Sequence, residues 1–410
     1  MSRYRRGDPT FVVGGVSLAH FLSHVFLLAY PPLFPLLARE FDVSIGQLGL
    51  LVTAIYVPQL LLQLPLGEVV DRIGAKWVLV SGLAVTSLSI GGSGLATSYW
   101  ILLGFAFVSG IGQSVFHPAD YALLGAVTTS NNEGLGFSVH TFGGYAGFAA
   151  APLAIGTIGI ALEWQIALVG AGAVGGLAAV GLALAMDTVH ARSIGPGTND
   201  SDESTIRQMS TFVKQVDLLA VFVFYLVSMM ALVGLQSFTS VLAVDAFGFT
   251  NSTANTLLTV HLAATALGVI AGGPLADRAP FRWVIVGTFV LSAVGVIVLV
   301  LGGSRTSVAA FALLALIGLV FGLALPSRDK FANSVVDPQS VGKSFGFFFT
   351  GLSLGAVVSP ALLGAIIDGR SARTAFVVVS GLLVVAASVV VWEIFRERAT
   401  RKGRFTTRIR

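Results

Sequence analysis

The sequence contains no cysteine and few charged residues. Of its 410 residues, 55% are hydrophobic and only 11% are Asp, Glu, Lys or Arg. Without cysteine the chain can form no disulfide, no catalytic thiolate and no cysteine-ligated metal centre. Soluble domains usually carry about 25% charged residues, so this composition does not fit a water-exposed surface. We therefore expect the chain to lie in a lipid bilayer.

Long apolar runs separated by short polar turns are the main feature that is present. A helix needs about 20 apolar residues to cross the hydrocarbon core, and a spanning segment must satisfy its own backbone polar groups. The runs predict an all-α membrane protein with twelve transmembrane helices, at about 11–37, 47–67, 76–96, 98–123, 135–159, 164–187, 216–243, 253–274, 284–303, 306–328, 342–366 and 373–395.

A hydrophilic stretch at 188–215 divides these spans into two sets. Its Gly, Pro, Ser and acidic residues are typical of a flexible linker. We expect an N-terminal six-helix bundle at 1–187, a cytoplasmic linker at 188–215, a C-terminal six-helix bundle at 216–395 and a basic cytoplasmic tail at 396–410.

Basic residues predict the orientation. Of the 24 Lys and Arg, all but four fall on the side of the termini and the linker; the exceptions are Arg39, Arg305, Arg370 and Arg373. Lys and Arg accumulate in cytoplasmic loops, so we place both termini in the cytoplasm and the protein in the cytoplasmic membrane. The net charge of +4 then reflects topology, and we expect no nucleic-acid partner.

Two loops, 67–77 and 272–283, share a skeleton of glycine, three residues, Asp-Arg and a basic residue before Trp. The three leading residues of one loop recur in the other at a displacement of 206: Gly67, Asp71 and Arg72 with Gly273, Asp277 and Arg278. Prolines and a GxxxG pair also recur, at a displacement of 208: Pro118, Gly143, Gly147 and Pro152 with Pro326, Gly351, Gly355 and Pro360. This recurrence predicts two parallel six-helix repeats, an arrangement found in alternating-access transporters.

The repeated loops are candidate conformational latches. A carboxylate beside a tight turn can face the positive N-terminal end of a neighbouring helix, and such a contact favours one of two conformations. The alternative is that the basic residues only fix topology. The expected gating residues are Gly67, Asp71, Arg72, Lys76, Gly273, Asp277, Arg278 and Arg282.

Polar side chains inside the spans mark a candidate site, because such side chains are costly in lipid and so face protein or a wet cavity. Histidine suits proton handling, since its ordinary pKa lies near 6.5. The expected substrate or proton contacts are His20, His24, Tyr56, Gln59, Gln63, Gln113, His117, Asp120, His140, Tyr225, Gln236, His261 and Arg328.

Several of these residues admit a second interpretation. His20 and His24 are spaced as a metal pair, but their helix offers no third ligand, and we expect no metal and no cofactor. They are either structural histidines that form hydrogen bonds, or cavity-lining residues that bind substrate or carry protons. Asp120 is either a coupling residue or a partner of a helix end or a basic side chain. Arg328 is either an anion ligand or part of a cluster at the membrane interface; as the repeat counterpart of Asp120, it is also a candidate for a charge pair at an intracellular gate.

The loop after the second span resembles the most characteristic signature of the major facilitator superfamily, matching it at Gly67, Asp71, Arg72, Gly74 and Lys76. The resemblance covers essentially the whole chain. It implies two six-helix bundles that rock about a central site, and a role for Asp71 in holding the cytoplasmic side closed.

Within the superfamily, VFHP at 115–118 followed by HTFGGYAG is similar to the fosmidomycin-resistance type of exporter. Two positions depart from related signatures. Ala106 stands where many proton-driven exporters have arginine, and Ala151 stands where the antiporter signature has glycine before proline.

The sequence therefore favours a secondary active transporter, not an enzyme, that moves a small polar or anionic organic solute outward by proton antiport. An importer or uniporter of an organic acid is the first alternative. An intramembrane enzyme and a channel are more remote; the duplicated latches favour alternation over a continuous pore. The partners we expect are a small-molecule substrate, protons and the bilayer, with the chain as a monomer.

Overall fold

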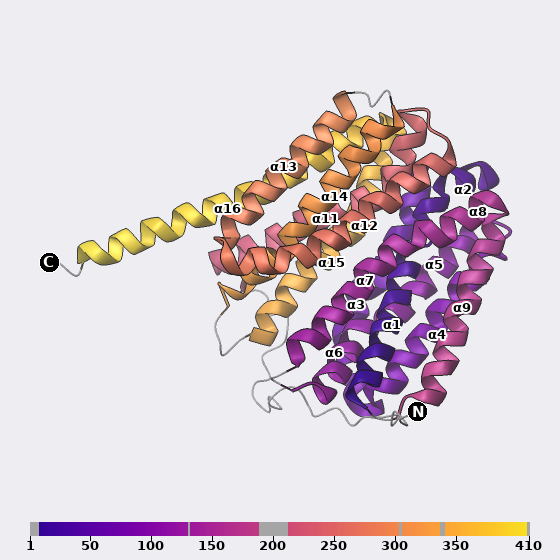
Figure 1. The fold of residues 1–410 in the computed structure, drawn as a ribbon, viewed down its shortest axis with the longest axis horizontal. Helices are drawn as coiled ribbons and strands as arrows, with labels where there is room; N and C mark the ends of the chain where they lie inside the picture. Colours follow the sequence, from indigo (N-terminus) through magenta and orange to yellow (C-terminus); the bar gives the residue numbers. More distant parts are fainter. Residues whose placement is uncertain (1–7, 130–131, 188–211, 303–305, 337–340, 408–410) are drawn as a thin grey trace.

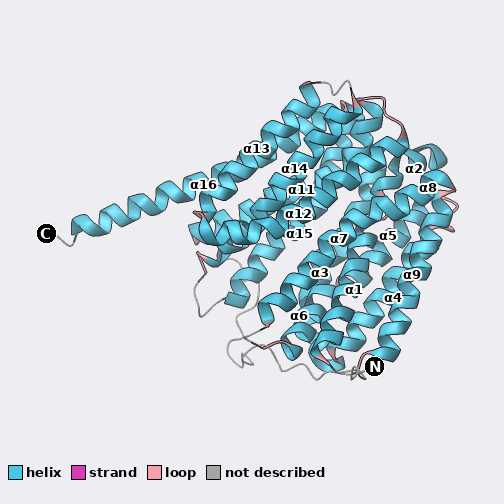
Figure 2. Cartoon of the chain, viewed as in Figure 1, coloured by secondary structure: helices cyan, strands magenta, loops and turns pink. Residues whose placement is uncertain are grey.

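The computed structural model describes residues 8–129, 132–187, 212–302, 306–336 and 341–407. Within these residues the regular structure is helical throughout, and twelve helical segments are long and apolar enough to cross a membrane (Figure 2). The prediction of twelve spans is confirmed. Most of the expected linker, 188–211, and the last residues of the tail, 408–410, lie outside the described residues.

The first six spans form the N-terminal half. Its helices are α1 (Pro9–Leu27), α2 (Phe34–Phe41), α3 (Ile45–Ile73), α4 (Ala75–Ser93), α5 (Tyr99–Gln113), α6 (Phe116–Val127), α7 (Glu133–Ala151), α8 (Thr157–Ala161) and α9 (Trp164–Ala185). A short 3₁₀-helix at Pro31–Leu33 lies between α1 and α2, and a short π-helix at Pro152–Gly156 joins α7 to α8.

The last six spans form the C-terminal half, which lies beside the first in Figure 1. Its helices are α11 (Val216–Asp245), α12 (Asn251–Arg278), α13 (Phe281–Leu301), α14 (Ser307–Asn333), α15 (Val341–Gly369) and α16 (Ala372–Thr407). The last helix is longer than the predicted span at 373–395, and it continues beyond the bundle (Figure 1).

Prolines and one glycine set the breaks between helices. Pro31 and Pro32 have no N–H to donate, so the first span cannot continue as one helix and turns at Tyr30, whose hydroxyl bonds Ser93 Oγ at 2.6 Å. The turn between α3 and α4 is a single residue, Gly74, with φ of 96°. A side chain is strained at this φ, which explains why glycine stands in the middle of the repeated loop.

The two halves repeat the same packing. The first and fifth spans of each half pack together, as α1 with α7 and α11 with α15, and the third and sixth do so as α4 with α9 and α13 with α16. The GxxxG pairs occupy the first of these contacts. A side chain on Gly147 would strike the carbonyl of Phe21 on α1, and one on Gly355 would strike that of Leu226 on α11. Both pairs thus let two backbones approach closely.

The halves meet through α3 with α15 and α7 with α12. The contacts gather at one end of the bundle, which we call the closed end and define by Ser44, Gly46, Pro152, Asn255 and Asp368. Ser44 Oγ donates to Asp368 Oδ2 at 2.6 Å, and the Gly46 N–H donates to the same carboxylate at 3.0 Å. On the other pair of helices, Asn255 Nδ2 donates to the Pro152 carbonyl at 2.8 Å.

The repeated Asp-Arg loops lie at the opposite end. Three ion pairs found there each join residues of the same half: Arg72 with Glu68, Lys330 with Asp277, and Arg282 with Glu397. The conformation is therefore one in which the closed end holds the two halves together.

Candidate functional site

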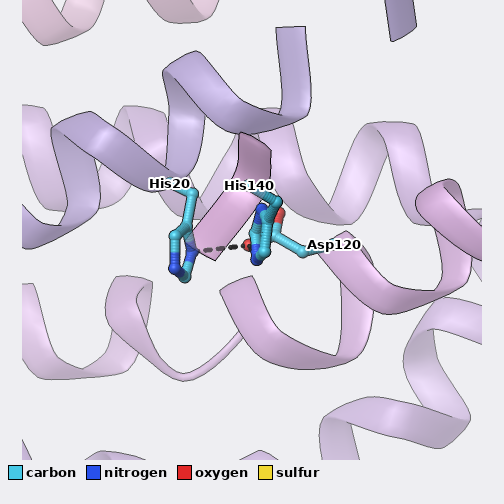
Figure 3. Close-up of side chains that lie close together, drawn as sticks. All are labelled: His20, Asp120 and His140. Atoms are coloured by element: carbon cyan, nitrogen blue, oxygen red, sulfur yellow. Dashed lines mark hydrogen bonds and ion pairs between the residues drawn. The ribbon is translucent and has the colours of Figure 1, made fainter. Parts of the chain in front are cut away.

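A buried carboxylate and two imidazoles meet inside the N-terminal half (Figure 3). Asp120 of α6 is 0% exposed, and its Oδ2 lies 2.9 Å from His20 Nδ1 of α1 and 3.7 Å from His140 Nε2 of α7. The two imidazole rings lie 3.8 Å apart between centroids. Three residues distant in sequence thus form one polar group, which we call the Asp120 group.

A break in the fourth span positions Asp120. Pro118 cannot donate to the carbonyl four residues earlier, and the chain turns between Gln113, where α5 ends, and Phe116, where α6 begins. Both parts still face α1. Gln113 Nε2 donates to the Ser23 carbonyl at 2.8 Å, while Asp120 meets His20 one turn away on the same helix.

A glycine makes room for the histidines on α1. The rings of His20 and His24 lie 4.3 Å apart, and a side chain on Gly144 of α7 would come within 2.8 Å of His20 Nε2. His24 Nδ1 lies 3.0 Å from the His20 carbonyl, and the His117 ring lies 5.8 Å from that of His20. These two histidines therefore surround the Asp120 group and do not join it directly.

Two atoms of the group have no hydrogen-bond partner among the described residues. These are Asp120 Oδ1 and His140 Nδ1, both buried. An unpaired buried carboxylate oxygen is costly, and a bound proton removes that cost by neutralising the carboxyl group or by charging an imidazole next to it. The arrangement can thus hold a proton and pass it between carboxylate and imidazole over 2.9 Å.

The three residues of the Asp120 group also have the ligand types and the proximity that a metal ion requires. One ligand atom each from His20, Asp120 and His140 lies within 4.8 Å of the others. A closed structural zinc site takes four protein ligands, and His20 and Asp120 already bond to each other. His24, the second histidine of the spacing on α1, is not in this set. Among the described residues this set supplies three ligand atoms, one fewer than a closed structural zinc site takes.

A second feature lies between the two halves, toward the end with the Asp-Arg loops. A cavity of about 460 Å³ is bounded by α7, α12 and α14, and we call it the interface cavity. Its aromatic wall is on α7, from Phe137, Phe142 and Tyr145, and its charged wall is on α14, from Arg328 and Asp329.

The charged wall is held by a tyrosine of α11. Arg328 Nε donates to Asp329 Oδ1 at 2.9 Å, and the Tyr225 hydroxyl donates to the same oxygen at 3.1 Å. The guanidinium carbon lies 5.2 Å from the Tyr225 ring centroid. Arg328 therefore belongs to the cavity, and the charge pair with Asp120 that its repeat position suggested does not form in this conformation.

The remaining expected site residues lie apart from both features. Gln59 Nε2 donates to a carbonyl of its own helix α3, and His261 Nδ1 lies 3.2 Å from the Leu314 carbonyl between α12 and α14. Tyr56 and Gln236 are buried on α3 and α11, and Gln63 is partly exposed on α3.

The expected gating residues lie at the end of the bundle opposite the closed end. Asp71 and Arg278 are exposed, and Lys76 is buried with its Nζ 4.6 Å from the Trp77 ring centroid. Gly273 lines the interface cavity. Their latch role remains a prediction.

The spacing GLSLG at 351–355 also matches the GxSxG motif of serine hydrolases. That motif works on a sharp strand-to-helix turn. Here it lies inside α15, and a side chain on Gly351 or Gly355 would strike a backbone carbonyl of α11, so the glycines serve helix packing.

The sequence did not single out the aromatic wall or the closed end. Phe137, Phe142 and Tyr145 looked like ordinary apolar residues of a span. Asp368 and Ser44 lie at helix ends, where polar residues are common, and only their meeting across the two halves reveals a role.

The sequence matches the model of a known protein family. The family model of the Major Facilitator Superfamily matches residues 16–250 and 218–408, which together cover nearly all of the chain. The chain belongs to the major facilitator superfamily. The resemblance of the loop at 67–77 is thereby confirmed.

Two bacterial superfamily members are similar over almost their full length. The uncharacterized MFS-type transporter YfnC of Bacillus subtilis (strain 168) is 27% identical over 380 residues, which cover 92% of this chain and 90% of that protein. The fosmidomycin resistance protein of Escherichia coli (strain K12) is 27% identical over 369 residues, which cover 88% and 87% respectively.

Solved structures of the superfamily share the fold. A bacterial homolog of the human lysosomal transporter Spinster, in an inward-facing and occupied conformation, has a TM-score of 0.78 at 16% identity and covers 93% of this chain and 96% of its own. A point mutant of the nucleoside transporter NupG has a TM-score of 0.76 at 13% identity and covers 93% of this chain and 99% of its own. The protein is thus a multi-pass membrane transporter similar to efflux and drug-resistance proteins, and its relatives are transporters, not enzymes.

Proposed function

We propose that this transporter exports a small polar or anionic organic solute across the cytoplasmic membrane in exchange for protons. The observation that carries the proposal is the Asp120 group, in which a fully buried carboxylate contacts two imidazoles. Ionisable residues inside a membrane span belong to ion or proton pathways by default. Histidine is the side chain best suited to exchange protons near neutral pH.

Helix α7 supports a link between proton and solute. It carries His140 at the Asp120 group and Tyr145 at the interface cavity, and it leads to Pro152, whose carbonyl accepts from Asn255 at the closed end. Gain or loss of a proton at Asp120 changes the attraction that holds α7 to α1 and α6. A shift of α7 then alters the cavity and the closed end together, as exchange between two conformations requires.

We assign the closed end to the outer side of the membrane, and both termini to the cytoplasm. The support is the distribution of Lys and Arg, which favours the end with the Asp-Arg loops. In this orientation the structure is an inward-facing conformation, and the interface cavity receives solute from the cytoplasm. Outward transport is also the direction that agrees with a relative named for fosmidomycin resistance.

Everted membrane vesicles test the proposal. Respiration acidifies their lumen, and an acridine dye reports this as quenching. We expect at least one member of a panel of aliphatic and aromatic organic acids, with fosmidomycin included, to reverse the quenching in vesicles that contain the wild-type protein. Asp120→Asn should abolish the reversal while leaving expression intact. Glu40→Gln, at an exposed carboxylate of α2, is the matched control and should behave as wild type.

Two results would contradict the proposal. Equal reversal by Asp120→Asn and wild type would remove the Asp120 group from coupling. Solute accumulation in respiring right-side-out vesicles, with none in everted ones, would support import of an organic acid in place of export.

A further inference from the structure

We propose that the interface cavity is the solute site, that it selects solutes combining a flat aromatic ring with an anionic group, and that it is separate from the Asp120 group. This inference rests on the proposed transport function and adds the class of solute and the place where it binds.

The aromatic wall argues for a flat ring. Phe137, Phe142 and Tyr145 all project from α7 into the cavity, and Val269 and Ile270 of α12 line it from the other half. Phe142 is 46% exposed although it lies at the interface of the halves. Aromatic side chains bind rings in offset-stacked or edge-to-face arrangements, which a compact sugar or a short aliphatic acid cannot use.

The charged wall argues for an anion. The Arg328 side chain is 16% exposed and the Asp329 side chain 57%, so the cation lies deeper than the acid beside it. Asp329 is engaged through one oxygen by both Arg328 Nε and the Tyr225 hydroxyl. The guanidinium carbon lies 5.2 Å from the Tyr225 ring centroid. Besides Nε, the guanidinium carries further N–H donors, and arginine can bind a carboxylate or phosphonate by two parallel hydrogen bonds.

An aromatic layer lies between the cavity and the Asp120 group. The ring of Phe137, which lines the cavity, lies 5.6 Å from that of Tyr121. The Tyr121 ring in turn lies 6.1 Å from His140 and 5.9 Å from His117. A solute in the cavity therefore meets Tyr121 and Phe137 before it meets the histidines. Solute and proton bind at different places, and the helices between them carry the coupling.

The test is equilibrium binding to the purified full-length protein in detergent. The probe is 2-naphthoate, and three compounds are compared with it. 2-Naphthylmethanol lacks the anion, 2-naphthylmethylamine reverses the charge, and cyclohexanecarboxylate lacks the aromatic ring. We expect 2-naphthoate to bind at least tenfold more tightly than each of the other three. Arg328→Gln should remove the preference over 2-naphthylmethanol, and Arg328→Lys, which keeps the charge but loses the flat edge, should weaken it.

Matched variants separate a direct contact from a general loss of structure. Phe142→Leu should weaken binding of 2-naphthoate, whereas Phe107→Leu, at an equally exposed phenylalanine of α5 outside the cavity lining, should not. Each variant is first required to run as a single species in size-exclusion chromatography. If Arg328→Gln fails this requirement, Arg328→Lys and Phe142→Leu carry the test.

Asp120→Asn distinguishes this inference from the proposed function. It should still bind 2-naphthoate with the wild-type order of preference among the four probes, with its affinity shifted by the coupling, even though it no longer moves protons. Loss of binding in Asp120→Asn would show that solute and proton share one site and would overturn the separation. Equal binding of the four probes, or none, alongside intact proton-coupled flux of another solute would overturn the solute class and leave the proposed function standing.

Discussion

The closed end depends on one carboxylate, and Asp368→Asn should open it. Asp368 at the end of α15 accepts from Ser44 Oγ at 2.6 Å and from the Gly46 N–H at 3.0 Å. Ser44 is the N-cap of α3 and Gly46 lies in its first turn, and the helix has 29 residues. The carboxylate therefore caps the positive end of a long helix that belongs to the other half. An asparagine keeps one oxygen and loses the charge.

The free energy that Asp368→Asn removes from the closed end follows from these contacts. A hydrogen bond to a charged group contributes about 1.5–3 kcal/mol, and a helix N-terminus adds about 0.3–1 kcal/mol for a nearby anion. Asp368 is exposed, so solvent screens both contributions and the lower bounds apply. Asparagine still accepts from one of the two donors, so the expected loss is one charged hydrogen bond at its lower bound, about 1.5 kcal/mol. This corresponds to about a tenfold shift in the equilibrium toward the conformation with the closed end apart.

The absence of cysteine gives a direct assay. Cysteines introduced at Glu40 and Arg370, two exposed residues near the closed end on opposite halves, can carry spin labels without removing any native cysteine. Pulsed electron paramagnetic resonance then gives the ratio of short to long distances in each variant. We expect Asp368→Asn to change this ratio about tenfold.

Asp245→Asn is the matched control for the closed end. Asp245 is an exposed carboxylate at the end of α11, and the hydrogen bonds described at the closed end do not include it. Its variant should leave the distance ratio unchanged. A ratio within twofold of the parent in Asp368→Asn would refute the reasoning, because the capping carboxylate would then contribute nothing to closure.

Two further predictions concern packing and the repeated loop. Gly147→Ala places a methyl group against the Phe21 carbonyl and 3.0 Å from His24 Cβ. This overpacking should cost about 1–3 kcal/mol of stability and lower the melting temperature. The control is Gly170→Ala on α9, whose methyl group would meet nothing within 4 Å and should not lower the melting temperature. Asp71→Asn, reconstituted in liposomes, should impair transport while expression stays intact, and wild-type flux would refute the latch.

The architecture could be predicted because the membrane constrains it so strongly. A span must be helical and apolar, so composition alone located the twelve runs. The recurrence of glycines and prolines added the packing: Gly147 and Gly355 meet the carbonyls of Phe21 and Leu226 in equivalent places of the two halves. Repeated small residues carry this information because only they allow two helix backbones to approach so closely.

The three residues of the Asp120 group were among the thirteen candidates taken from the sequence, but their meeting was not predicted. The spacing of Gln113 and Asp120 suggested one continuous helical face, whereas the chain breaks between α5 and α6. Both side chains still face α1, since one bonds the Ser23 carbonyl and the other bonds His20. Which histidine would meet Asp120 could not be inferred from spacing, because its two partners come from two other helices, α1 and α7.

The interface cavity and the closed end lay beyond sequence reasoning for a different reason. A phenylalanine that lines the cavity and an exposed one outside the lining give the same apolar pattern, as Phe142 and Phe107 illustrate. Asp368 and Ser44 are 324 positions apart and each looks like an ordinary helix-end residue. Only packing of one half against the other distinguishes them from neighbours of the same type.

The repeats have kept their scaffold while the chemistry at equivalent positions has diverged, and a proline shows how. Pro118 follows a break in the fourth span, whereas its counterpart Pro326 lies inside the unbroken α14. Two residues after each proline stands a charged side chain, Asp120 in one half and Arg328 in the other. The broken helix buries its carboxylate among histidines, while the continuous helix presents its guanidinium to the interface cavity. If the Asp120 group binds the proton and the charged wall binds the solute, as we propose, then the two halves can respond differently to one change between two conformations.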